Sequence, residues 1–171
     1  MQRMTRSMGA FAAASVLVLT GAACGSDDAS DDTTTTTAQA ESGTDFLAEI
    51  EARGEPTLSA AEPATELVVT DDVEGTGTEV QAGDTITAHY TGVSASTGEV
   101  FDSSWTRGEP ATFPLNGVIQ GWSEGLVGMK EGGRRTLVIP GEMAYGSNPP
   151  PGAGIAPNET LIFTVDLVSV D

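Results

Sequence analysis

The side chains able to carry out chemistry are few in this chain of 171 residues. It contains one Cys, Cys24, and one His, His89, which excludes an internal disulfide and a metal site built from clustered cysteines or histidines. His89 lies within a run of alternating apolar and polar residues and has no evident catalytic partner, so a place in a sheet or core is favoured over catalysis. The sequence therefore predicts no nucleophilic catalysis, no metal and no cofactor.

The aromatic residues form a second candidate group, because most of them fall between positions 90 and 163. They are Tyr90, Phe101, Trp105, Phe113, Trp122, Tyr145 and Phe163. A buried core is the simpler interpretation. Two features favour a lined pocket: both tyrosines lie close to glycines that suit loops, and Asp102 places a carboxylate directly after Phe101. A buried Tyr also needs a hydrogen-bond partner.

Strand-like segments that would position these rings begin near Glu66. They are separated by turn signals and read ELVVTDDV, DTITAHYTGV, EVFDSS, RRTLVIP and ETLIFTVDLVSV. Residues 85–91 alternate apolar and polar side chains, as a half-buried antiparallel strand does. Residues 160–168 are richer in apolar side chains, so we expect that strand to be central. Residues 94–98 suit a hairpin connection.

One segment, residues 118–129, has helical periodicity, with its apolar side chains on one face. Its three glycines make it a weak helix alone, so packing must hold it. One short helix beside several antiparallel strands predicts an α+β fold, in which a twisted antiparallel sheet wraps around the helix.

Residues 1–23 have the composition of an export signal. Arg3 and Arg6 precede an apolar run that is shorter than the ~20 residues of a membrane-spanning helix. Cys24 follows small residues at 21–23, an arrangement that resembles the lipobox of bacterial lipoproteins, in which the cysteine is lipidated. An ordinary secretory signal with an incidental cysteine is the alternative. We expect a lipoprotein signal peptide over 1–23, lipidation of Cys24, and export to the outer face of the bacterial cell membrane.

Residues 24–55 have the acidic, low-complexity composition of a tether. Within this segment Phe46, Leu47 and Ile50 share one helical face, and Thr44 occupies the cap position. A short helix resting on the domain and a transient helix both fit this pattern. The folded domain is expected over residues 56–171.

The chain is strongly acidic, with a formal net charge of −18. Nucleic acids and anionic head groups attract Lys and Arg, so neither is expected as a partner of its surface. Solubility through self-repulsion is the simpler interpretation of the charge, and selection against anionic partners is the functional one. Membrane attachment is thus expected through the lipid anchor alone, and a monomer is expected by default.

Five short motifs occur in order along the expected domain. They are His89-Tyr90-Thr91-Gly92, Phe101-Asp102-Ser103-Ser104, Val118-Ile119-Gln120-Gly121-Trp122, the stretch from Gly125-Leu126 to Met129, and Ala144-Tyr145-Gly146. Each is weak alone, but together they resemble the FKBP-type peptidyl-prolyl isomerases over roughly residues 66–171. The resemblance implies a twisted antiparallel sheet around one short helix, and substrates that are proline-containing polypeptides.

The resemblance also implies a role for each residue of the family's pocket. The lining would consist of Tyr90, Phe101, Asp102, Phe113, Val118, Ile119, Trp122, Tyr145, Ile155 and Phe163. Trp122 would lie under the substrate proline ring. The backbone N–H of Ile119 and the hydroxyl of Tyr145 would donate hydrogen bonds to substrate carbonyls. Asp102 would orient polar groups near the reacting amide, with Arg107 as a candidate partner for its charge.

The chain departs from the family pattern in one wall and one loop. Ala111 stands where many members have an aromatic residue, and Gly154 where a larger apolar residue is common. The loop at 147–154 is slightly long. These changes are expected to affect ligand affinity and substrate preference more than the fold.

The sequence thus predicts an FKBP-type peptidyl-prolyl cis-trans isomerase that assists the folding of exported proteins. It would act by stabilising a twisted X–Pro amide in an aromatic pocket. A binding module or chaperone with little turnover is the alternative, favoured by Ala111 and Gly154. A solute-capturing lipoprotein is a third hypothesis, and it would require a larger, two-lobed domain.

Overall fold

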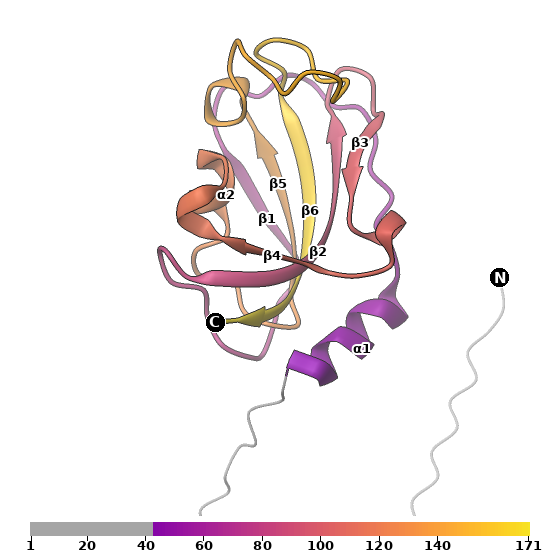
Figure 1. Ribbon diagram of the computed structural model, residues 1–171, viewed down its shortest axis with the longest axis vertical. Helices are drawn as coiled ribbons and strands as arrows, with labels where there is room; N and C mark the ends of the chain where they lie inside the picture. Colours follow the sequence, from indigo (N-terminus) through magenta and orange to yellow (C-terminus); the bar gives the residue numbers. More distant parts are fainter. Residues whose placement is uncertain (1–42) are drawn as a thin grey trace, which may run out of the picture. The chain divides into compact units, whose positions relative to one another are not determined.

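The computed structural model describes residues 43–171, and this part of the chain is built on one antiparallel sheet (Figure 1). The strand order is β1-β5-β6-β2-β3, and β4 also pairs with β2. The strands are β1 (Val68–Val73), β2 (Thr85–Ser94), β3 (Val100–Ser103), β4 (Ala111–Pro114), β5 (Arg134–Ile139) and β6 (Leu161–Val170). The predicted α+β fold is confirmed.

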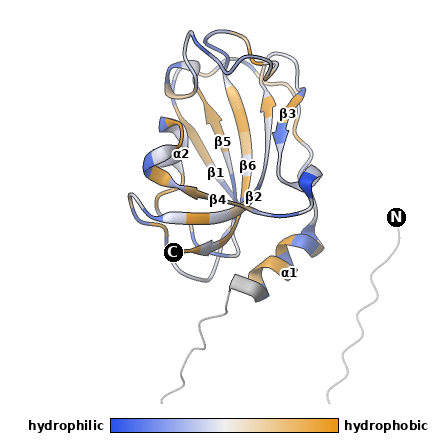
Figure 2. Cartoon of the chain, viewed as in Figure 1, coloured by the Kyte–Doolittle hydropathy of each residue, from blue (hydrophilic) through white to orange (hydrophobic). Residues whose placement is uncertain are grey.

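Strand β6 lies in the middle of the sheet, as its apolar sequence predicted. It pairs with β5 on one side and with β2 on the other, and Figure 2 shows hydrophobic residues along both β5 and β6. Because side chains alternate across a strand, β6 contributes apolar side chains to both faces of the sheet. Phe163, Val165 and Leu167 join the main core, whereas Val168 belongs to a separate cluster on the other face.

Helix α2 (Gln120–Gly125) packs on the main-core face of the sheet, and it is shorter than the predicted 118–129. Its glycines explain both its weakness and its position. A Cβ on Gly121 would lie 2.4 Å from a side-chain carbon of Ile139, and one on Gly125 would lie 2.8 Å from Leu137. Glycine at these two positions therefore lets the helix approach β5 closely, and packing rather than helix propensity holds it.

Helix α1 (Gly43–Arg53) lies within the segment 24–55 that was expected to be a tether. Phe46 and Ile50 are fully buried and form a cluster with Val168 of β6. Of the two alternatives for this segment, the helix resting on the domain is the one the structure contains. The sequence predicted the apolar face of this helix, but it did not predict the surface of the sheet, around Val168, against which that face packs.

An ion-pair triad ties α1 to the sheet. Asp166 of β6 has no exposed surface, and it accepts hydrogen bonds from Arg53 at 3.0 Å and from Arg134 at 2.8 and 2.9 Å. Two guanidinium groups thereby satisfy a buried carboxylate, whose burial without partners would be costly. The predicted signal peptide, Cys24 and the first part of the predicted tether lie outside the described residues.

Short helical turns complete the path of the chain around the sheet. They are η1 (Trp105–Arg107), η2 (Leu115–Gly117) and η3 (Gly141–Met143). The hairpin predicted at residues 94–98 joins β2 to β3, and Gly98 adopts a φ of 73°, which favours glycine. Within residues 43–171, none of the helices combines the length and the hydropathy needed to cross a bilayer.

Candidate functional site

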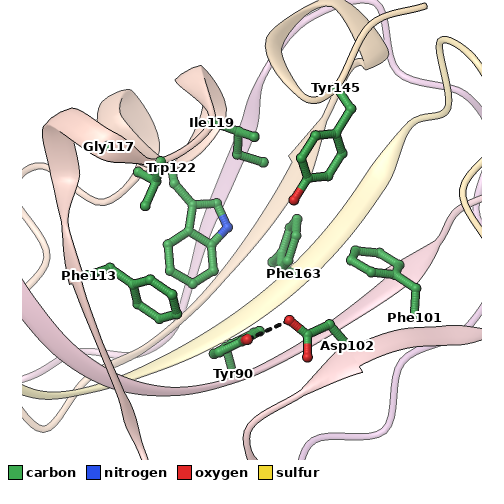
Figure 3. Close-up of a pocket in the computed structure, with 10 residues that line it drawn as sticks. Tyr90, Phe101, Asp102, Phe113, Gly117, Ile119, Trp122, Tyr145 and Phe163 are labelled. Carbon is green, nitrogen blue, oxygen red and sulfur yellow. Dashed lines mark hydrogen bonds between the residues drawn. The ribbon is translucent and has the colours of Figure 1, made fainter. Parts of the chain in front are cut away.

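A cavity of about 270 Å³ opens between α2 and the main-core face of the sheet. Figure 3 shows its side chains converging from β2, β3, β4, α2, β6 and the loop after η3. The residues lining it are Tyr90, Phe101, Asp102, Phe113, Gly117, Val118, Ile119, Trp122, Tyr145 and Phe163. Nine of the ten residues predicted for the pocket are therefore brought together.

Trp122 is the centre of the aromatic lining. Its ring meets those of Tyr90, Phe113 and Phe163 edge to face, with centroid distances of 5.4, 5.3 and 5.3 Å. Such contacts stabilise beyond the burial of area alone, by about 0.5–1.5 kcal/mol per pair. Trp122 is only 4% exposed, so the rings hold it as a rigid floor.

Asp102, Arg107 and Tyr90 form one polar network at the edge of this floor. The Tyr90 hydroxyl donates to Asp102 Oδ2 at 2.5 Å and accepts from Arg107 Nη2 at 2.8 Å. Arg107 Nη1 donates to Asp102 Oδ1 at 2.8 Å, so each group contacts both of the others. The predicted pairing of Arg107 with Asp102 is confirmed, and the shared tyrosine hydroxyl was not foreseen.

Burial and the network together change the acidity of the two tyrosines. Burial and the hydrogen bond to Asp102 raise the pKa of Tyr90 to about 12, although Arg107 opposes the shift. The pKa of Tyr145 is also raised, first by burial and then by the charge of Asp102. Both phenols therefore stay protonated at neutral pH and can donate hydrogen bonds.

Tyr145, from the loop after η3, and Ile119, at the start of α2, lie near each other at one end of the cavity (Figure 3). The residue Tyr145 is 36% exposed, and its hydroxyl points into the cavity (Figure 3). Within residues 43–171 this hydroxyl has no hydrogen-bond partner, so it is available to a ligand. Ile119 caps α2 in an extended conformation, and its carbonyl accepts the N–H groups of Trp122 and Ser123.

Ile155 is the predicted lining residue that the structure places elsewhere. It is half-buried and packs against the main core, but it does not line the cavity. Its loop contains Gly152 and Gly154, both at positive φ. The position of Ile155 could therefore not be predicted from its distance along the chain to the other pocket residues.

The two residues that depart from the family pattern, Ala111 and Gly154, do not line the cavity. Gly117 does so and was missed, because a glycine shows no side-chain signal.

His89 occupies the position in the sheet that its sequence context predicted. It is 2% exposed on β2, its Nδ1 lies 2.9 Å from Ser104 Oγ, and its ring stacks on Trp105. Burial lowers its pKa, against the opposing charges of Asp166 and Glu51. Across the described residues, no group of three or more His, Cys, Asp or Glu is arranged to hold a metal ion.

Comparisons with known proteins agree with this geometry. The sequence profile of the family described as "FKBP-type peptidyl-prolyl cis-trans isomerase" matches residues 76–168. A protein named "FK506-binding protein" from Streptomyces anulatus is 51% identical over 118 residues, which are 68% of this chain and 95% of that protein. A "Probable FK506-binding protein" from Corynebacterium glutamicum is 52% identical over 63% of this chain and 90% of its own length.

A solved relative extends the likeness to three dimensions. The crystal structure of FkpA from Escherichia coli matches with a TM-score of 0.57 and 40% identity, covering 75% of this chain and 57% of FkpA. The chain therefore belongs to the FKBP-type peptidyl-prolyl cis-trans isomerases, and proline-containing polypeptides are the substrates of that family.

Proposed function

We propose that this isomerase acts on exported polypeptides and that the aromatic cavity is where it twists the X–Pro bond. The observation that carries the proposal is the cavity, in which five edge-to-face rings surround about 270 Å³ of space beside the hydroxyl of Tyr145. The export step rests on the signal-like residues 1–23 and on Cys24.

The proposed mechanism needs neither a nucleophile nor a metal. Rotation about X–Pro is opposed by amide resonance, with a barrier of about 18–20 kcal/mol. Water stabilises the polar, planar amide more than the twisted amide, so a cavity that excludes water favours the twisted form. Groups that bind the twisted form more strongly than the planar form accelerate rotation, and each tenfold acceleration requires about 1.4 kcal/mol of preference.

The residues at the floor and the polar edge of the cavity have different roles in this mechanism. The indole of Trp122 supports the proline ring, because it is the floor of the cavity. The Tyr145 hydroxyl and the Ile119 N–H donate to substrate carbonyls, which fixes the segment while the amide turns. Asp102 stays paired with Arg107 and holds the Tyr90 hydroxyl, so that the polar edge of the cavity does not reorganise during rotation.

The direct test is a prolyl isomerisation assay with a proline-containing peptide, on the whole chain solubilised in detergent. We expect catalysis above the buffer rate. Tyr145→Phe is expected to lower kcat/KM about 3- to 10-fold, the effect of losing one hydrogen bond. Glu99→Gln, on an exposed turn away from the cavity lining, is the matched control and should leave kcat/KM unchanged. Catalysis no faster than buffer contradicts the proposal.

The same assay separates the second hypothesis from the first. Tight binding of a proline-containing peptide with negligible turnover identifies a binding module. Because two relatives carry the name FK506-binding protein, we also expect FK506 to compete with the peptide for the cavity. Membership of the isomerase family leaves the solute-capturing hypothesis without support. Mass analysis of the mature amino terminus tests whether Cys24 is acylated.

A further inference from the structure

The two charged members of the polar network are carried by a lightly supported edge of the sheet. Asp102 lies on β3, which has four residues and pairs only with β2, where the register shifts between Gly92 and Val93. Arg107 lies on η1, the single turn that follows. A short edge strand with an irregular register cannot fix two side chains by itself. Their positions therefore depend on what packs behind β3 and η1.

Trp105 is the first contact behind this edge, and it shares the turn η1 with Arg107. Its side chain packs against the cluster formed by Phe46 and Ile50 of α1, and its ring stacks on His89 with centroids 4.2 Å apart. Figure 1 shows α1 next to the turn that follows β3. One end of η1 is thus held by α1, while the other end delivers Arg107 to Asp102 and Tyr90 at the cavity.

Glu55, just after α1, is the second contact. Its Oε1 accepts hydrogen bonds from Ser103 Oγ at 2.8 Å and from Thr91 Oγ1 at 3.0 Å, and so bridges β3 to β2. Ser103 Oγ also accepts the backbone N–H of Trp105 at 3.2 Å. Ser103 directly follows Asp102, so the carboxylate of Glu55 holds the backbone from which Asp102 projects. Hydrogen bonds to a charged group are stronger than those between neutral groups.

We propose that Trp105 and Glu55 are positioning residues for the isomerase site: from the face of the sheet opposite the cavity, they hold β3 and η1 so that Asp102, Arg107 and Tyr90 stay in register. This inference rests on the proposed function, because it assigns the supports of the same site. Neither residue lines the cavity, and both act through the segment that carries the network. The helix α1 thus takes part in the activity by way of Trp105.

The test measures kcat/KM for the whole chain at a temperature where every variant is folded by circular dichroism. Trp105→Ala and Glu55→Ala are expected to lower kcat/KM about tenfold, because small displacements of groups at a site have large kinetic effects. Trp105→Phe and Glu55→Gln keep the stacking ring and the acceptor oxygen, and should retain most of the activity. These conservative variants also serve if an alanine variant does not fold.

Two controls separate positioning from general destabilisation. Leu58→Ala removes a packed side chain from the same face of the sheet, in the cluster of Val93 and Ile162 that does not touch η1. Glu49→Ala removes an exposed carboxylate from α1. Both should leave kcat/KM unchanged at that temperature, although Leu58→Ala will lower the melting temperature.

A double-mutant cycle gives the decisive measurement. In an Asp102→Ala background the network is already broken, so adding Trp105→Ala should lower kcat/KM by less than about twofold, a strongly non-additive result. Equal losses in both backgrounds overturn the inference, as does full activity of Trp105→Ala and Glu55→Ala alone. An inactive parent chain would instead contradict the proposed function, so the two failures are distinguishable.

Discussion

Tyr90 links the apolar and the polar halves of the cavity. Its ring lies edge to face on Trp122 and Phe113, while its hydroxyl is held between Asp102 and Arg107. The guanidinium of Arg107 also lies 5.6 Å from the centre of the Tyr90 ring. A single side chain therefore fixes the position of the network relative to the aromatic floor.

The raised pKa of Tyr90 predicts how stability changes at alkaline pH. The folded state holds the phenol protonated to a pKa of about 12, whereas a phenol in the unfolded chain titrates near pH 10. The stabilisation is thus fully present below pH 10 and is lost as the pH rises through 12. We expect the free energy of unfolding, measured in urea, to fall over this interval. Lys130 is the one lysine of the chain, so tyrosines dominate the titration there.

Variants of the network should shift the pH range over which the free energy of unfolding falls, and the two variants should shift it in opposite directions. Asp102→Asn removes a charge that raises the Tyr90 pKa, so the loss should begin and end at lower pH. Arg107→Met removes a group that lowers the pKa, so the loss should move to higher pH. Absorbance titration in a Tyr145→Phe background, which leaves Tyr90 as the chain's one tyrosine, reads the pKa directly. Equal shifts in the same direction would contradict this account.

The composition of the site was predictable to a large extent, because rings and a carboxylate in motif order identify the family's pocket. Two kinds of information were missing. Gly117 lines the cavity through its backbone, which leaves no pattern in a sequence. Ile155 follows a glycine-rich loop, and the path of such a loop depends on tertiary packing rather than on local propensity.

At the level of elements, α2 shows how packing replaces propensity. The segment has a clear apolar face, yet only Gln120–Gly125 forms a helix. Its glycines have low helix propensity, but they allow the helix to pack closely against β5. The same balance makes a prediction. Gly121→Ala improves intrinsic helix propensity by about 1 kcal/mol, but its Cβ would lie 2.4 Å from Ile139.

We expect the steric effect to dominate in Gly121→Ala. Overpacking a core typically costs about 1–3 kcal/mol, so the variant should unfold at lower urea concentration. The compensating change Ile139→Val in the same chain should recover part of the loss. Gly128→Ala is a poor control, because its φ of 80° adds backbone strain. Increased stability of Gly121→Ala would show that α2 can move away from the sheet at little cost.

The strands were more predictable than the helices, because alternating apolar and polar residues indicate which face of a strand is buried. The strands β2, β5 and β6 occur where apolar residues alternate or cluster. Strand β4 was not predicted, and it forms where β2 offers it a partner edge. Helix α1 was read as either docked or transient, because its partner Val168 lies more than a hundred residues away.

The triad of Arg53, Asp166 and Arg134 predicts the strength of α1 docking. Removing a buried carboxylate from its partners typically costs about 3–5 kcal/mol, because the partners remain buried without compensation. Asp166→Ala is expected to show a loss of this size in urea unfolding. Arg53→Ala should cost less, since Arg134 still satisfies Asp166 and the Arg53 side chain is 23% exposed. A loss below about 1 kcal/mol for Asp166→Ala contradicts this role.

For the whole molecule, charge is the dominant property. The net charge is −18, and in the described residues four arginines are already paired with carboxylates. The surface field is therefore negative and attracts cationic chains over a distance of about 10 Å at 0.1 M salt. Substrate segments rich in Lys or Arg should encounter the cavity faster than acidic ones.

This preference gives a test at the scale of the molecule. Two proline-containing peptides that differ only by Lys or Glu at positions flanking the X–Pro bond are compared in kcat/KM at low salt. The lysine peptide is expected to be processed several-fold faster, and raising the ionic strength to about 1 M should remove most of the difference because exposed charges are screened. A difference that persists at high salt would indicate local contacts instead of the overall field.

The docking of α1 on β6 has a consequence for the order of assembly. The partners of the helix, Asp166 and Val168, lie on β6, more than a hundred residues later in the chain. A chain emerging amino terminus first therefore carries a helix whose binding surface does not yet exist. Strand β6 also joins β2 to β5, so neither the helix nor the two halves of the sheet can be completed early. We therefore expect α1 to dock and the sheet to close together, once β6 is available.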